Sequence, residues 1–273
     1  MSSQIEQAPV GHLQLQIDGS LATLTICHSA RRNAMTRAMW RALQGIGAQL
    51  PSQVRCLILR GRGEHFCAGG DISEYPDFRF SPDTLEHFHE QEVAPGLQAL
   101  LDLDIPIVAQ IAGHCMGGGL EIACCADIRI AGQSATFGVP IAKLGMPMAL
   151  RELALVLQVA GEATVRELLL TACVLSAAEM KARGFLQRVA PSDDDLASQV
   201  NEAALRICAL SPQAARLNKR AMRLLLKQSQ AFTGIEFTRN AINSIVTDSY
   251  AYASSAEHVE GITAFLEKRP TQF

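Results

Sequence analysis

The sequence predicts an α/β fold with a helical carboxyl-terminal part, and three observations lead to this expectation. Short apolar strands alternate with helical segments up to about residue 145, which is the pattern of stacked strand–turn–helix units. Nearly every later segment has helical spacing. Hydrophobic residues make up 48% of the 273-residue chain and charged residues 19%, so the chain can bury a large core. We expect an α/β core at residues 1–195 and a helical region at residues 196–273.

The first predicted elements form a β-hairpin. Apolar and polar residues alternate over residues 12–18, the pair Gly19-Ser20 follows, and a second apolar run covers residues 21–26. Residues 35–50 then have helical spacing, with Thr36 placed to cap the helix. Further strands are expected at residues 54–59, 105–111, 128–131 and 135–137, and helices at residues 85–103, interrupted near Pro95, and 117–126.

Helical spacing dominates the second half of the chain. The expected helices cover residues 150–170, 177–183, 196–210, 212–230, 234–250 and 255–268. Only residues 185–189 are typical of a strand in this half.

Composition limits the classes of partner and the compartment. Lysine and arginine total 24 against 27 acidic residues, a net charge of -3, which argues against nucleic acid as a partner. The 8 cysteines form no C-x-x-C pair and several have apolar neighbours, which indicates free, buried thiols in a reducing compartment. Residues 1–19 lack the apolar core of a signal peptide, and no apolar run reaches membrane-spanning length. We therefore expect a soluble, cytoplasmic protein with no membrane partner.

Two glycine-rich turns are the strongest candidates for a functional site. Residues 65–72 follow the strand predicted at 54–59, and residues 113–121 follow the strand predicted at 105–111. Glycines let a ligand approach the backbone closely, and free N–H groups at a helix start attract negative charge. Neither turn matches G-x-G-x-x-G or the phosphate-binding loop, so a Rossmann dehydrogenase is not supported. Together the turns suggest paired backbone donors directed at one developing oxyanion.

Five segments in order resemble the crotonase (enoyl-CoA hydratase/isomerase) superfamily. Residues 66–72 are similar to its F-x-[AS]-G-x-D-[IL] segment, and residues 113–127 to its G-x-x-x-G-G-G-x-E-x-x-x-x-x-D segment. The other three are R-R-N-A-M at residues 31–35, F-G-V-P at residues 137–140 followed by Gly145, and E-G-I-T-A-F-L-E-K-R at residues 260–269.

The resemblance implies a fold, a substrate and an assembly. The fold would be a spiral of ββα turns followed by a helical trimerisation region, with a homotrimer or a hexamer built as a dimer of trimers. The substrate would be an acyl-CoA thioester. Because CoA is part of that substrate, the resemblance implies no separate cofactor, and no residues have the spacing of a metal site.

By motif position, the resemblance also assigns site residues. The backbone N–H groups of Gly70 and Gly118 would form an oxyanion hole for the thioester carbonyl, and Glu121 would be a catalytic acid or base. The residues expected to contact substrate are Arg32, Ala34, Ala68, Gly70, Asp71, Ile72, Gly117, Ile141, Met148, Phe265 and Lys268.

The sequence departs from the family at one important position. The second hydratase glutamate should follow Pro140, where this chain has Ile141, and Lys143 is not an assured replacement. Three functions therefore stay open: a hydratase or isomerase that uses Glu121 alone or a further residue that the sequence does not identify, a malonyl-type acyl-CoA decarboxylase or other enolate-forming enzyme, and a catalytically weak acyl-CoA-binding or RNA-binding relative. The net charge argues against RNA, and the intact Gly70, Gly118 and Glu121 argue against an inactive protein. For His65 and His114, beside the two turns, we expect a structural role.

Overall fold

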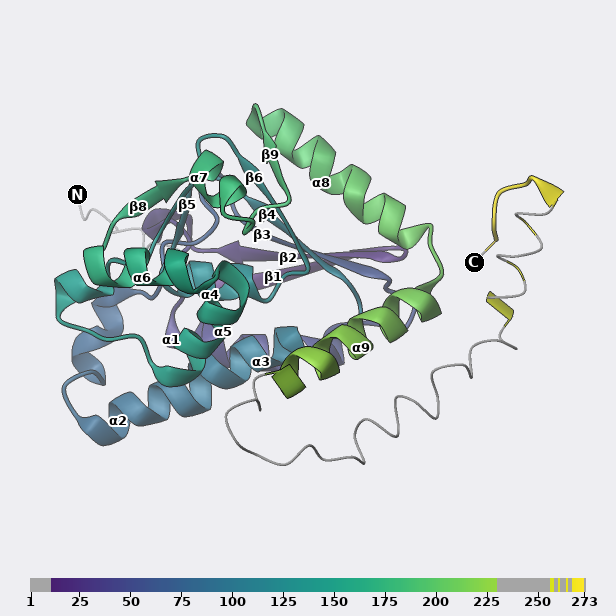
Figure 1. The fold of residues 1–273 in the computed structure, drawn as a ribbon. Helices are drawn as coiled ribbons and strands as arrows, with labels where there is room; N and C mark the ends of the chain where they lie inside the picture. The colour runs from purple at the N-terminus through teal and green to yellow at the C-terminus, as the bar shows by residue number, and fades with distance from the viewer. Residues whose placement is uncertain (1–10, 230–255, 258–259, 261–263, 265–266, 273) are drawn as a thin grey trace, which may run out of the picture.

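The computed structural model describes residues 11–229, 256–257, 260, 264 and 267–272 (Figure 1). A mixed six-stranded sheet with strand order β1-β2-β3-β4-β6-β9 lies at the centre, and a smaller sheet has the order β5-β7-β8. The α/β class predicted from the alternation of strands and helices is confirmed. No helix among the described residues is long and apolar enough to cross a membrane.

The predicted hairpin is present at the edge of the large sheet. Strands β1 (His12–Asp18) and β2 (Leu21–Cys27) pair in antiparallel register, with Leu15 opposite Leu24. The following strands join in parallel: β3 (Cys56–Gly61), β4 (Ile107–Ile111), β6 (Ile128–Gly132) and β9 (Arg188–Ala190). Parallel pairing places the turns that follow β3 and β4 at the same edge of the sheet, where the two glycine-rich segments begin.

The smaller sheet contains two strands that the sequence did not predict. Its members are β5 (His114–Met116), β7 (Thr136–Gly138) and β8 (Val174–Ser176), each three residues long. Three residues are too few to show an alternating pattern, so only their pairing in the folded chain identifies β5 and β8.

Most predicted helices are present with different ends. Thr36 does cap α1 (Arg37–Gln44), since its hydroxyl oxygen accepts the Met39 N–H at 3.2 Å, but this helix ends well before residue 50. The helix predicted at 85–103 is α2 (Pro82–His87), a π-helical turn (Phe88–Val93) and α3 (Ala94–Leu101). The expected interruption is thus the π turn just before Pro95.

The long helix predicted at 150–170 is two helices. Gly161, with φ +82°, separates α5 (Leu150–Ala160) from α6 (Glu162–Thr171). The remaining helices are α4 (Gly118–Cys124), α7 (Ala177–Ala182), α8 (Asp193–Cys208) and α9 (Pro212–Ser229). The helix predicted at 234–250 lies outside the described residues, and the segment 255–268 is described only in part.

Alternation along the parallel strands builds a core on each face of the large sheet. Cys56 and Ile58 of β3 pack with α8, whereas Leu57 and Leu59 face the core that α1 and α3 cover (Figure 1). All eight cysteines are free, and only Cys173 is not buried. The boundary near residue 195 and the trimeric assembly stay predictions.

A buried carboxylate joins α1 to the π turn. Glu92 is 2% exposed and accepts hydrogen bonds from Arg37 (2.6 and 3.0 Å) and Arg41 (3.0 Å). Burial alone would raise the pKa of Glu92, but the two guanidinium groups outweigh it and hold that pKa below its usual range. The carboxylate therefore stabilises the fold above its unfolded-state pKa, and this contribution is lost as the pH falls.

We expect Glu92→Gln to lower the free energy of unfolding by about 1–3 kcal/mol at neutral pH, because it leaves two guanidinium groups without their counter-charge. The deficit should shrink in acid, where the wild-type carboxylate is also neutralised. Urea unfolding at several pH values measures it. Glu90→Gln is the control, because Glu90 pairs with the exposed Arg151. Equal losses in the two variants would contradict the role given to Glu92.

Candidate active site

Backbone pairing brings the two glycine-rich turns side by side. The Phe66 N–H donates to the Ala112 carbonyl (2.7 Å), the Cys67 N–H to the His114 carbonyl (2.9 Å), and the Met116 N–H to the Cys67 carbonyl (2.9 Å). The two segments therefore run in parallel up to the point where each becomes glycine-rich. Residues separated by nearly fifty positions in the sequence meet at one edge of the fold.

Gly70 and Gly118 each present a backbone N–H group at this junction. The Met35 N–H donates to the Gly69 carbonyl and the Asp71 N–H to the Met35 carbonyl, so the N–H of Gly70 points away from Met35. Gly118 is the first residue of α4, where an N–H has no intrahelical acceptor. A Cβ atom on Gly69 would lie 3.7 Å from the Gly118 nitrogen, which shows how closely the turns approach.

The third glycine of the second turn is required by packing. A Cβ atom on Gly119 would lie 2.4 Å from the Cys67 carbonyl oxygen, and that oxygen belongs to the backbone of the first turn. Gly117 has φ +46°, a conformation that favours glycine. These two glycines hold the turns together, and Gly118 between them remains available to a ligand.

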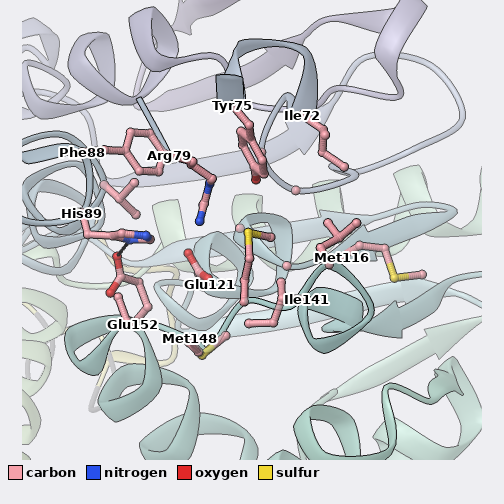
Figure 2. A pocket seen from close by; sticks show the side chains of 18 of the residues that line it. Ile72, Tyr75, Arg79, Phe88, His89, Met116, Glu121, Ile141, Met148 and Glu152 are labelled. Atoms are coloured by element: carbon pink, nitrogen blue, oxygen red, sulfur yellow. Dashed lines mark hydrogen bonds and ion pairs between the residues drawn. The ribbon is translucent and has the colours of Figure 1, made fainter. Parts of the chain in front are cut away.

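The junction opens into a pocket of about 120 Å³ (Figure 2). Its walls include six parts of the chain: the two glycine turns, the segment with Tyr75 and Arg79, the π turn before α3, the 3₁₀ turn (Pro140–Leu144), and the start of α5. Ile141 and Met148 supply much of its apolar surface, as Figure 2 shows.

Glu121 lies in the first turn of α4, on the wall beside Gly118 (Figure 2). Burial raises the pKa of its carboxyl group to about 8; the negative charge of Glu152 adds to this effect, and the positive charge of Arg79 opposes it. At neutral pH the group is therefore mostly protonated, and it can both give and take a proton within the physiological range.

Arg79 enters the same pocket from the opposite side, above Glu121 in Figure 2. Its guanidinium lies 4.1 Å from the centre of the Tyr75 ring and also stacks near Phe78 and Phe88. Burial raises the pKa of the Tyr75 phenol against the opposing effect of Arg79. The Tyr75 oxygen lies against Gly70, since a Cβ atom there would come within 2.5 Å of it.

Sequence analysis missed a second carboxyl group in this pocket. Glu152, in the first turn of α5, is 2% exposed and lines the cavity together with Glu121 (Figure 2). Its Oε1 lies 3.0 Å from Nδ1 of His89, and its buried Oε2 has no hydrogen-bond partner. A glutamate at a core-facing position of the helix predicted at 150–170 was the available signal, because polar residues at core positions usually have a function.

The structure places many of the predicted site residues together. Those that line the pocket are Ala68, Gly70, Ile72, Gly117, Gly118, Glu121, Ile141 and Met148. Ala34 and Asp71 are buried behind the first turn, where Oδ1 of Asp71 accepts hydrogen bonds from the N–H and hydroxyl of Ser73. Arg32 and Lys268 are exposed and do not line the pocket, and Phe265 lies outside the described residues.

The other candidate side chains do not line the pocket. His65 and His114 stack with their ring centres 4.5 Å apart, and Nδ1 of His114 is hydrogen-bonded to Thr136, in agreement with a structural role. Lys143 is exposed. Among the residues that the structure describes, no group of three or more His, Cys, Asp and Glu side chains is arranged to hold a metal ion.

Comparison with known proteins gives consistent matches over nearly the full length. A family model described as enoyl-CoA hydratase/isomerase matches residues 16–273. The mevalonyl-coenzyme A hydratase of Aspergillus fumigatus is 31% identical over 92% of this chain and 90% of its own. A crystal structure of an enoyl-CoA hydratase/carnithine racemase from Magnetospirillum magneticum has 32% identity and a TM-score of 0.85, and covers 96% of this chain and 94% of its own.

Proposed function

The chain belongs to the enoyl-CoA hydratase/isomerase family, and on this premise we propose how its pocket works. The family assignment confirms the resemblance inferred from the five sequence segments and the crotonase fold that it implied. We propose that an acyl-CoA thioester binds with its carbonyl oxygen between the N–H groups of Gly70 and Gly118. Glu121 then transfers a proton at the α-carbon of the acyl group.

The convergence of two backbone donors and one carboxyl group in a single pocket is the observation that supports this function best. Drawing electron density onto the thioester oxygen gives the α-carbon the character of an enolate. Two preorganised donors stabilise that developing charge, and one such donor contributes about 3 kcal/mol to transition-state stabilisation. Glu121 starts one helical turn after Gly118, so its carboxyl group is within reach of the carbon next to the polarised carbonyl.

The remaining predicted contacts complete this proposal. Ile141 and Met148 form an apolar wall for the acyl group, and Ala68, Ile72 and Gly117 border the same opening. Arg32, Ala34, Asp71, Phe265 and Lys268 are proposed to contact the CoA portion. The protein then needs no separate cofactor, because CoA arrives with the substrate. The decarboxylase and RNA-binding alternatives gain no support from the relatives described above.

Turnover of a panel of 2-enoyl-, 3-enoyl- and malonyl-type acyl-CoA thioesters tests the function. We expect either addition of water or movement of the double bond, and no loss of CO₂, because Glu121 is placed for proton transfer. Mass spectrometry detects the addition of water and the loss of CO₂. Absorbance of the conjugated enoyl thioester detects movement of the double bond. Release of CO₂ alone would favour the decarboxylase, and an unchanged panel would contradict the proposed function.

A further inference from the structure

We propose that Glu152 is a second catalytic carboxyl group and that it takes a proton from the water molecule that adds to a 2-enoyl-CoA thioester. This inference rests on the proposed function, and it selects hydration among the reactions that an oxyanion hole and Glu121 permit. The position where the family's second glutamate is expected holds Ile141, so that side chain cannot accept the proton. A carboxyl group from a different element lies in the same pocket instead.

The two carboxyl groups reach the pocket from adjacent helices. Glu121 belongs to α4 and Glu152 to α5, and these helices pack against each other. Figure 2 shows Glu121 below the Arg79 guanidinium and Glu152 to its side, with the Glu152 carboxyl group next to His89. Their proximity is also evident in the charge of Glu152, which raises the pKa of Glu121. A substrate acyl group in this pocket would therefore lie near both carboxyl groups.

An unused hydrogen-bond acceptor points to a missing ligand at Glu152. The side chain is 2% exposed, and Oε2 is buried without a partner. A buried carboxylate oxygen without a donor is unfavourable, so such an oxygen usually has a partner in the working molecule. A water molecule poised for addition would donate to Oε2, because a carboxylate is the natural acceptor for the proton that the water gives up.

His89 positions this carboxyl group. Its Nδ1 lies at hydrogen-bond distance, 3.0 Å, from Oε1, which holds that oxygen in place and leaves Oε2 without a partner. His89 comes from the π turn, an irregularity often found at functional sites, and itself lines the pocket. The first turn of α5 contributes as well, because the helix dipole favours a negative side chain there. We assign His89 as a positioning residue.

The proposed step balances without another reactant. The Glu152 carboxylate takes a proton from water, and the water oxygen forms a bond to the β-carbon. The electron pair of the carbon–carbon double bond moves toward the α-carbon and the thioester oxygen, which Gly70 and Gly118 stabilise. The protonated Glu121 gives its proton to the α-carbon. Proton exchange with solvent then returns both carboxyl groups to their starting states.

The test compares Glu152→Gln with Glu121→Gln and with the control Glu92→Gln. Glutamine keeps the size of the side chain and an oxygen that can face His89, but it cannot take the proton. Glu92 is an equally buried carboxylate that does not line the pocket. We expect Glu152→Gln to lower kcat for hydration of crotonyl-CoA about 10²–10⁴-fold. Glu92→Gln should change kcat by less than about threefold at a temperature where it is folded.

Exchange of α-protons separates the two carboxyl groups. In D₂O, Glu121 and the oxyanion hole should exchange the α-protons of butyryl-CoA without any water addition. We expect Glu152→Gln to retain this exchange within about threefold of wild type, and Glu121→Gln to lose most of it. Nuclear magnetic resonance of butyryl-CoA follows the exchange. A residue that merely supports the fold would not lower hydration selectively.

Each other outcome overturns the proposal. Hydration by Glu152→Gln within threefold of wild type would exclude Glu152 as the base. Loss of hydration, exchange and thermal stability together would make Glu152 a structural residue. A wild type that exchanges α-protons but hydrates no 2-enoyl-CoA would overturn this inference and leave the proposed function standing. If the wild-type protein neither exchanges α-protons nor hydrates a 2-enoyl-CoA, and converts no other thioester, both this inference and the proposed function are overturned.

Discussion

Glu121→Gln is expected to lower turnover of the preferred acyl-CoA about 10²–10⁴-fold while making the folded protein more stable at neutral pH. The first effect follows from the loss of the group that exchanges a proton with the α-carbon. The second follows from the surroundings of Glu121, which disfavour its charged form. Glutamine has nearly the same shape and no charge, so it removes the cost of ionisation that the wild-type protein bears.

The direction of the stability change in Glu121→Gln follows from the pH dependence of folding. The pKa of Glu121 rises from 4.5 to about 8 on folding, so between these values the folded state binds more protons than the unfolded state. Wild-type stability must then fall as the pH rises through this window. The stability gained by Glu121→Gln should be near zero at pH 4 and reach about 4 kcal/mol by pH 8. Glu92→Gln should show the opposite trend, because folding lowers the pKa of that carboxyl group.

Chemical unfolding at several pH values, combined with steady-state kinetics, measures both effects. The pH profile of the wild type should also show a group that titrates near 8, and Glu121→Gln should remove it. Glu152→Gln should move this titration to lower pH, since it deletes a neighbouring negative charge. An inactive Glu121→Gln protein that is also less stable would indicate a structural role for Glu121. Full activity would exclude it from catalysis.

Local features of the fold were predictable from the sequence. The first hairpin, the cap at Thr36 and the buried strands β3 and β4 depend on residues close together in the chain, so periodicity and capping rules identify them. The glycine turns were identifiable for the same reason. That the two turns act together was also expected from the sequence, but nothing local specifies that residues 66–67 pair with residues 112–116.

The second carboxyl group of the pocket was not predictable in this way. Glu152 and His89 are 63 positions apart, and only the packing of α5 near the π turn brings them together. The sequence showed that Ile141 stands after Pro140 in place of the family's glutamate, but it did not show which other carboxyl group lines the pocket. Helix ends were also poorly predicted, because the apolar stripe on either side of Gly161 is continuous although the backbone changes direction there.

Gly118→Pro is expected to lower kcat about 10²–10³-fold relative to Gly118→Ala, because it removes the N–H assigned to the oxyanion hole. The comparison depends on the position of Gly118 as the first residue of α4. Proline is well tolerated there, since the missing N–H forms no helical hydrogen bond and the fixed φ suits a helix. Gly117 has φ 46° and ψ -118°, which is not the helical conformation that a following proline disfavours.

Gly118→Ala is the matched control for added bulk. In both variants the new Cβ atom would lie 3.0 Å from Cζ2 of Trp40, so both require the same small shift of that ring. Only the proline variant loses the donor and fills its position with a ring carbon. The alanine variant should therefore lose only the activity that the shift of the Trp40 ring costs. A difference of 10²–10³-fold between the variants corresponds to about 2.7–4 kcal/mol, the size measured for one oxyanion donor.

Circular dichroism and thermal unfolding must first show that the two variants fold alike, which the position at the helix start leads us to expect. Kinetics on the preferred thioester then isolate the N–H group. If the folded proline variant turns over substrate as fast as the alanine variant, the N–H of Gly118 does not stabilise the transition state. In that case the carbonyl must bind elsewhere in the pocket, and the Arg79 guanidinium is the next donor to test, because it is the cation that faces Glu121 there. A large difference with equal stability supports the paired-donor site.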